Sequence, residues 1–96
     1  MKPFLVYILA SQRHGALYAG STDDLARRIW QHKTKAFKGF TTDYSVNRLV
    51  WYEKHETRET AFTGERQIKE WKRRWKLDLI EAMNPEWGDL YLKLNH

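Results

Sequence analysis

Near its N-terminus the chain carries a continuous apolar run, Phe4-Leu5-Val6-Tyr7-Ile8-Leu9. This run is too short for a typical helix, and it is rich in the aromatic and β-branched residues that favour strands. A polar stretch with a glycine, residues 11–15, separates it from a second strand-like segment, residues 16–20. The two segments therefore predict a β-hairpin.

A helix is expected directly after the hairpin. Ser21 or Thr22 is the expected cap, with Asp23 and Asp24 in the first turn, at the positive end of the helix dipole. The helix is predicted to run to about Lys33, because apolar side chains recur at helical spacing up to that point.

The rest of the chain predicts one more strand and two more helical segments. Residues 34–47 indicate an irregular loop, and residues 48–53 indicate a third strand. A second helix is expected to begin near Thr57 and to break near Arg74, before a short last helix that ends ahead of Asn84 and its following proline. Its apolar stripe is expected to lie in the core, with a stacking platform as the less favoured alternative: Ile68, Trp71, Trp75 and Leu79.

The element order β-β-α-β-α-α predicts a small α+β domain, with helices covering a three-stranded antiparallel sheet. A length of 96 residues allows one domain, residues 1–96. The absence of cysteine excludes disulfides, thiolate nucleophiles and cysteine metal sites, and it suits the reducing cytoplasm. The longest apolar run is too short to span a bilayer.

The formal net charge of +5 suggests a polyanionic partner, most often nucleic acid, although an ordinary solvated basic surface is the alternative. The distribution of the charge favours a nucleic-acid face. The basic side chains gather in two stretches, which are Arg27, Arg28, Lys33, Lys35 and Lys38, and then Arg66, Lys69, Lys72, Arg73, Arg74 and Lys76.

Two polar residues are expected on the inward face of the first helix. Arg28 and His32 are four residues apart, beside Leu25 and Ile29, whereas Arg27 points away. A cation on an inward face is costly unless it meets an anion or opens onto a cleft. Alternatively, Arg28 extends its charged end to solvent, and His32 is a hydrogen-bonded, half-buried histidine.

Glu65 raises a similar question at the edge of the apolar stripe. Its carboxylate either pairs with a base such as Arg28 or binds a hard divalent cation through oxygen. Tyr7 and Tyr18 lie in the two arms of the hairpin. An even-numbered loop or a bulge near Gly15 would place both phenols on one side of the sheet, beside the arginine and the histidine.

The ordered motifs Leu5-Val6-Tyr7, Tyr18-Ala19-Gly20 and Arg28 resemble the GIY-YIG nuclease family, and above all its small single-domain bacterial members. Leucine and alanine stand where the two motifs carry glycine and isoleucine, at positions that serve strand packing. The likeness continues through residues 40–44, 48–53, 65–69 and 84–87, so it covers a core of about residues 4–90.

The resemblance implies metal-dependent hydrolysis of phosphodiester bonds, usually in DNA, with a single Mg²⁺ or Mn²⁺ ion. Matched residue by residue, the catalytic positions of the family fall on Tyr7, Tyr18, Arg28, His32 and Glu65, with Glu65 as the metal ligand and Asn84 as a supporting asparagine.

These roles make chemical sense for phosphodiester cleavage. Glu65 with its metal ion would neutralise the phosphate, and Arg28 would clamp a non-bridging oxygen. Tyr18 rather than Tyr7, or else His32, would orient or deprotonate the attacking water. Flanking phosphates would be held by the basic residues Arg27, Lys33, Lys35, Lys69, Lys72, Arg73, Arg74 and Lys76.

Two functions follow as alternatives. The first is a metal-dependent DNA endonuclease, selective for branched, nicked or single-stranded forms and assisted by a protein partner that supplies specificity. The second is a nucleic-acid-binding module of the same fold that has lost cleavage or depends on a partner. The three polar residues Arg28, His32 and Glu65 favour the enzyme, because binding alone needs only the basic faces.

Overall fold

The computed structural model describes residues 3–34, 39 and 44–94. Most of the predicted loop 34–47, including Lys35 and Lys38, lies outside the described residues. The elements along the chain are β1 (Phe4–Ala10), β2 (Leu17–Thr22), α1 (Leu25–Lys33), β3 (Arg48–His55), α3 (Arg58–Glu70), α4 (Arg73–Met83) and the 3₁₀ turn η1 (Leu90–Lys93).

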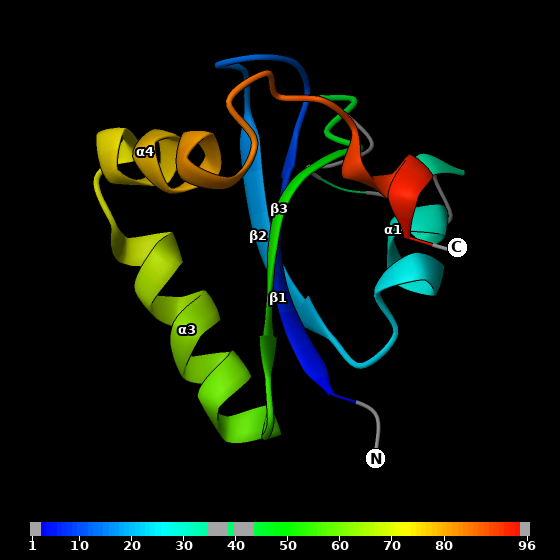
Figure 1. Cartoon of the computed structure of the whole chain (residues 1–96), viewed down its shortest axis with the longest axis vertical. Coiled ribbons are helices and arrows are strands. Elements are labelled where there is room, and N and C mark those ends of the chain that lie inside the picture. The colour runs from blue at the N-terminus through cyan, green and yellow to red at the C-terminus, as the bar shows by residue number, and fades with distance from the viewer. Residues whose placement is uncertain (1–2, 35–38, 40–43, 95–96) are drawn as a thin grey trace.

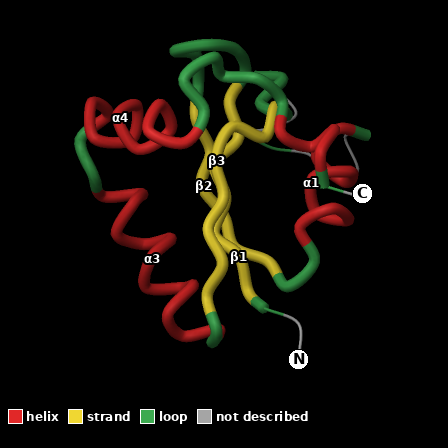
Figure 2. Tube along the Cα trace, in the orientation of Figure 1, coloured by secondary structure: helices red, strands yellow, loops and turns green. Residues whose placement is uncertain are grey.

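The three strands form one antiparallel sheet in the order β2-β1-β3, so the predicted fold class is confirmed. Figures 1 and 2 show the sheet nearly edge-on, with α3 and α4 on one side and α1 and η1 on the other. The central strand β1 is buried on both faces: Val6 and Ile8 pack toward α3 and α4, and Leu5 and Leu9 pack toward α1. An apolar run with no polar alternation is what such a strand requires.

The register of the hairpin decides where the two tyrosines lie. Tyr7 pairs with Gly20, and Leu9 pairs with Tyr18. Because side chains alternate along a strand, Tyr18 lies on the same face as Gly20 and therefore on the same face as Tyr7. Residues 11–16 form the connection, which is the even-numbered loop that this arrangement needs.

Two helix boundaries differ from those predicted. Neither Ser21 nor Thr22 caps α1, because both still pair with β1 as the last residues of β2. Asp24 is the cap, and its carboxylate accepts a hydrogen bond from the Arg27 backbone N–H at 3.3 Å. The second helix begins as predicted after Thr57, whose hydroxyl accepts from the backbone N–H of residue 60.

The break between the last two helices falls earlier than predicted, at Trp71. This residue has an extended conformation, with φ −67° and ψ 152°, so the helical repeat restarts at Arg73. The restart carries Trp75 out of the core, and the residue is 52% exposed. The predicted core stripe is therefore wrong for Trp75, although Ile68 is buried as expected.

Among the described residues, no helix combines the length and the apolar character needed to cross a membrane.

Gly64→Ala is expected to stabilise the fold. A glycine inside a helix costs about 1 kcal/mol relative to alanine. At Gly64 a methyl group would lie 3.4 Å from the His55 ring and 3.6 Å from Val6, which is ordinary contact. We therefore expect the free energy of unfolding to rise by about 1 kcal/mol, measured by urea denaturation. A lower denaturation midpoint would mean that α3 cannot accept any added volume against the sheet.

Candidate active site

Three aromatic side chains meet on the α1 face of the sheet. The hydroxyl of Tyr7 lies 3.2 Å from Nε2 of His32 in a buried contact. The ring of Tyr18 lies 6.4 Å from the ring of Tyr7 and 5.5 Å from that of His32, between ring centroids. Helix α1 presents His32 to the strands because Ile29, one turn earlier on the same ridge, is anchored in the core.

Arg28 completes this group, which we call the tyrosine cluster: Tyr7, Tyr18, Arg28 and His32. The Arg28 side chain hydrogen-bonds to the Tyr7 phenol, and this contact does most to raise the pKa of the guanidinium above its ordinary value. The neighbouring Arg27 is exposed, as predicted. The inward orientation of Arg28 and His32 thus follows from their helical spacing.

Burial sets the protonation states inside the cluster. It raises the pKa of Tyr7 to about 12, although the hydrogen bond from Arg28 opposes the shift. Burial, followed by the positive charge of Arg28, lowers the pKa of His32 below its ordinary value. At neutral pH the cluster therefore holds a neutral phenol, a neutral imidazole and one fixed guanidinium.

Glu65 comes from the other side of the sheet, on α3. The Ser21 hydroxyl donates to Oε1 of Glu65 at 2.6 Å, and the Lys69 ammonium donates to Oε2 at 2.6 Å. The Glu65 side chain is only 14% exposed, so these two charge-assisted bonds hold it in place. The sequence leaves two partners open for Glu65, a basic side chain or a divalent cation. In the structure the carboxylate pairs with a basic side chain, which is Lys69.

The two halves of the site meet around the edge of the sheet. Strand β2 is an edge strand, with Tyr18 on its α1 face and Ser21 on its α3 face. A cavity of about 280 Å³, here called the edge cavity, opens at the end of this strand and is lined by Ser21, Arg28 and Arg58 among others. The edge cavity thus brings two guanidinium groups and the Asp23 carboxylate together at the end of β2, and Ser21 links it to the Glu65 carboxylate.

Glu65 offers a hard divalent cation a single carboxylate, whose two oxygens accept from Ser21 and Lys69. Within the parts of the chain that the structure describes, no three His, Cys, Asp or Glu side chains gather to hold a metal. Glu65 already has a cationic partner, the ammonium of Lys69, at one carboxylate oxygen. Mg²⁺ usually binds through one or two carboxylates and keeps water and phosphate oxygens as its other ligands.

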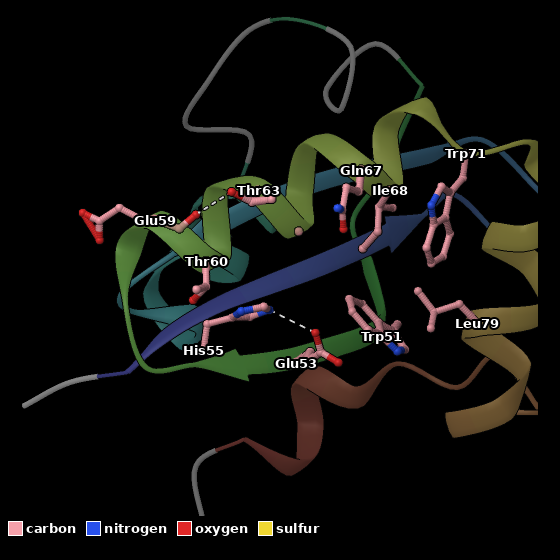
Figure 3. A pocket seen from close by; sticks show the side chains of 11 residues that line it. Trp51, Glu53, His55, Glu59, Thr60, Thr63, Gln67, Ile68, Trp71 and Leu79 are labelled. Carbon is pink, nitrogen blue, oxygen red and sulfur yellow. Dashed lines mark hydrogen bonds and ion pairs between the residues drawn. The ribbon is translucent and has the colours of Figure 1, made fainter.

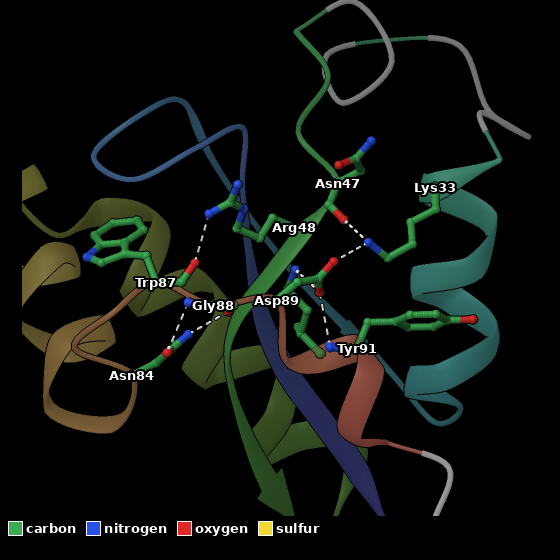
Figure 4. Close-up of polar contacts among 9 residues, drawn as sticks. Lys33, Asn47, Arg48, Asn84, Trp87, Gly88, Asp89 and Tyr91 are labelled. Atoms are coloured by element: carbon green, nitrogen blue, oxygen red, sulfur yellow. Dashed lines mark hydrogen bonds and ion pairs between the residues drawn. The ribbon is translucent and has the colours of Figure 1, made fainter.

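Asn84 lies outside the tyrosine cluster. Its amide donates to the carbonyl of Val50 at 3.1 Å. The amide also donates to the Gly88 carbonyl at 2.8 Å, and the Asn84 carbonyl accepts from the Gly88 N–H at 3.2 Å (Figure 4). These bonds fasten the end of α4 to β3. The residue therefore supports the fold, and the structure does not bring it to the other predicted site residues.

Several predicted nucleic-acid-binding residues have partners within the protein. Lys33 pairs with Asp89 and donates to the Asn47 carbonyl at 3.0 Å, which ties η1 to α1 (Figure 4). Arg73 donates to the backbone carbonyls of His14 and Gly15 at 2.6 and 2.7 Å. Both side chains therefore have a structural use that the sequence does not reveal.

The remaining basic residues lie mainly at the surface. Arg27 is exposed on α1, and Lys72 and Arg74 are exposed where α3 gives way to α4. Lys69 and Lys76 line one cavity of about 250 Å³ together with Tyr18. Lys35 lies outside the described residues.

The sequence does not indicate two residues of the site. Ser21 fixes the Glu65 carboxylate, and Arg58 brings a second guanidinium to the edge cavity. Ser21 directly follows the second tyrosine motif, a position that gives it a local sequence signal. Arg58 has no such signal, because its proximity depends on how α3 packs on the sheet.

Another large hollow is a groove of about 350 Å³ between α3 and β3 (Figure 3). It is lined by Trp51, His55, Gln67 and Trp71 among others, and by none of the predicted catalytic residues. It lies along β3, the edge strand opposite β2. The groove is larger than the edge cavity, but none of the predicted catalytic residues lines it, so we do not assign it as the catalytic site.

Gly20→Ala is expected to disturb the tyrosine cluster directly. The Tyr7 ring lies against Gly20, and an added methyl group would come within 2.5 Å of the Tyr7 hydroxyl oxygen. Tyr7 is fully buried, so its ring can move only by displacing its neighbours. We expect a loss of about 1–3 kcal/mol in the free energy of unfolding, the usual cost of overpacking. Urea denaturation beside Gly64→Ala checks this, and equal stabilisation by both changes would contradict it.

Comparison with known proteins shows which family the chain belongs to. The family model for the GIY-YIG catalytic domain matches residues 3–78. UPF0213 proteins from Haloquadratum walsbyi and Staphylococcus aureus are 33% and 32% identical to the chain, over 69% and 84% of its length and 74% and 98% of theirs. The solution NMR structure of a UPF0213 protein from Bacillus halodurans matches with a TM-score of 0.56 and 29% identity, over 97% of each chain. Tyr7, Tyr18 and Arg28 thus stand in the catalytic domain of a nuclease family, and the chain belongs to the GIY-YIG family, among its small UPF0213 proteins.

Proposed function

We propose that this protein is a metal-dependent endonuclease that hydrolyses phosphodiester bonds in DNA. The observation that supports this most is the convergence of Arg28 and the Ser21–Glu65 pair at the end of β2, beside the edge cavity. The Arg28 guanidinium would neutralise the phosphate on one side, and a divalent ion held by the Glu65 carboxylate would neutralise it on the other. A site used only to bind nucleic acid has no need for a desolvated carboxylate.

In this proposal each residue has one task. Arg28 holds a non-bridging oxygen of the scissile phosphate, with Tyr7 and Tyr18 fixing the orientation of its guanidinium. Glu65 is the ligand that would hold the divalent ion, and Ser21 keeps that carboxylate oriented. The ion, when bound, supplies positive charge to the phosphate and the leaving oxygen.

The attacking water needs one group to orient it and another to accept its proton. Tyr7 is a poor base, because its pKa of about 12 keeps the phenol protonated. Tyr18 is half-buried at the edge strand, with the Lys69 ammonium 5.9 Å from its ring centroid, so it is better placed to orient water. His32 is held neutral and can take up a proton that passes along the Tyr7 hydrogen bond.

The second candidate function is a nucleic-acid-binding module without turnover. The observation in its favour is the Lys69–Glu65 ion pair, because in this arrangement the carboxylate is already neutralised by the protein itself. Such a module would bind DNA through its basic side chains and would not need a metal ion.

A cleavage assay separates the two candidates. Labelled duplex, nicked, single-stranded, flap and branched DNAs are incubated with the protein in Mg²⁺, in Mn²⁺ or in EDTA. We expect cuts in at least one substrate with either metal and none in EDTA. Salt-dependent binding with no cuts in any metal would favour the binding module, and cuts that persist in EDTA would contradict metal dependence.

A further inference from the structure

A pair of tryptophans, one partly buried and one exposed, occupies the junction of the last two helices. Trp71 and Trp75 pack edge to face, with 6.3 Å between ring centroids, and Trp75 is 52% exposed. They border a shallow hollow with Leu79 and Asp78. We propose that Trp75 is a stacking platform for an unpaired base of the substrate, so that the strand cut is single-stranded next to the scissile phosphate.

Two lysines, Lys69 and Lys72, link this surface to the proposed catalytic site along the chain. The Lys69 ammonium is bound to Glu65 and lies 5.9 Å from the Tyr18 ring centroid. The Lys72 ammonium lies 5.8 Å from the Trp75 ring centroid. Lys69 and Lys72 are three residues apart, so their Cα atoms are separated by at most about 11 Å. A strand held by both lysines would therefore reach from the edge of the site to Trp75.

The charge around Trp75 selects the kind of partner. Its immediate neighbours along the chain are Arg74 and Lys76, and the Lys72 ammonium lies over its ring. An exposed aromatic ring bordered by cations suits a strand of nucleic acid, with bases on the ring and phosphates on the ammonium groups. Lys72 would exchange its contact with the ring for a phosphate and leave the ring face to the base.

The chemistry of stacking restricts the substrate. In a duplex the faces of the bases are covered by their neighbours, so an exposed tryptophan ring has no base to stack on. Unpaired nucleotides at a flap, a branch or a free strand do expose these faces. The inference rests on the proposed nuclease function and adds to it the preferred form of DNA.

Binding to two oligonucleotides of equal charge tests this. Labelled oligothymidine and an abasic strand of the same length are titrated with the protein in EDTA, where no turnover occurs, and Kd is measured by fluorescence anisotropy. We expect the base-bearing strand to bind about 5- to 150-fold more tightly, as stacking of one base on an aromatic side chain implies. Trp75→Ala should remove this preference, whereas Trp75→Phe should keep most of it.

Trp30→Ala is the matched control, because Trp30 is 54% exposed and lies on α1, across the sheet. It should leave the preference for bases unchanged. Equal affinity of the wild type for both strands, or a preference that survives Trp75→Ala, would overturn the inference and leave Trp75 as a contact for another protein. The metal-dependent cleavage assay tests the nuclease function separately. Cleavage by a protein that shows no preference for the base-bearing strand would overturn only this inference. A preference for the base-bearing strand without cleavage would overturn only the proposed nuclease function.

Discussion

Replacing Arg28 by alanine is expected to lower kcat for phosphodiester cleavage by about 10³-fold, at the low end of what an arginine supplies to a phosphoryl transition state. Arg28 is fixed by the Tyr7 and Tyr18 phenols, and it borders the edge cavity. Its guanidinium therefore needs no reorganisation as charge develops on the phosphate oxygens. Arg28→Lys should recover little of the loss, because an ammonium keeps the charge but not the fork of fixed donors.

Arg27→Ala provides the matched control, since it removes the same charge from the adjacent, exposed position. It should raise KM by a few-fold through a lost phosphate contact and leave kcat nearly unchanged. Steady-state kinetics on the best substrate of the panel would separate these effects, with circular dichroism to confirm folding. Normal kcat in folded Arg28→Ala protein would remove Arg28 from the catalytic site.

Local patterns predicted most of the helices and strands, and they predicted which side chains of α1 face the sheet. The apolar run of β1 and the spacing of Leu25, Ile29 and His32 are short-range signals, and the structure follows both. Helix α1 begins later than predicted because pairing with β1 keeps Ser21 and Thr22 in strand β2. The capping preference of a residue takes no account of such a contact.

Long-range contacts explain what the sequence did not reveal about the site. Glu65 meets strand β2 from the α3 face of the sheet through its hydrogen bond with Ser21, which joins residues 44 positions apart, and no helical wheel shows such a contact. The ion pair of Lys33 with Asp89 joins residues 56 positions apart. Trp75 lies outside the core because the helical repeat restarts after Trp71. A shift of the helical repeat at one residue turns every later apolar side chain to a different face of the helix.

The same distinction applies to the basic residues. Clustering along the chain indicated a nucleic-acid face, but it did not distinguish a lysine at the surface from an arginine that anchors a loop. Arg73 holds the hairpin loop through two carbonyls, whereas Lys72 next to it lies over the Trp75 ring. The number and clustering of charges therefore indicate a kind of partner. Only the packing shows which basic side chains remain available to bind it.

Glu65→Gln is expected to lower kcat/KM for metal-dependent cleavage by at least about 100-fold, because the change removes the carboxylate charge that would hold the divalent ion. The amide oxygen of glutamine can still accept the Ser21 hydroxyl, and the pair with Lys69 is partly exposed on the lysine side. The free energy of unfolding should therefore change by no more than about 1 kcal/mol. Cleavage kinetics and urea denaturation on the same preparation measure the two effects.

Glu59→Gln, an exposed change on the first turn of the same helix, is the control for the loss of one negative charge. It should leave kcat/KM within about twofold, since surface charges this far from a site are screened by salt. A second reading comes from Mn²⁺ binding followed by electron paramagnetic resonance. Glu65→Gln should weaken it at least tenfold and Glu59→Gln should not. If Glu65→Gln keeps both its Mn²⁺ affinity and its turnover, the carboxylate serves only to pair Lys69 and Ser21, and the metal ligand lies elsewhere.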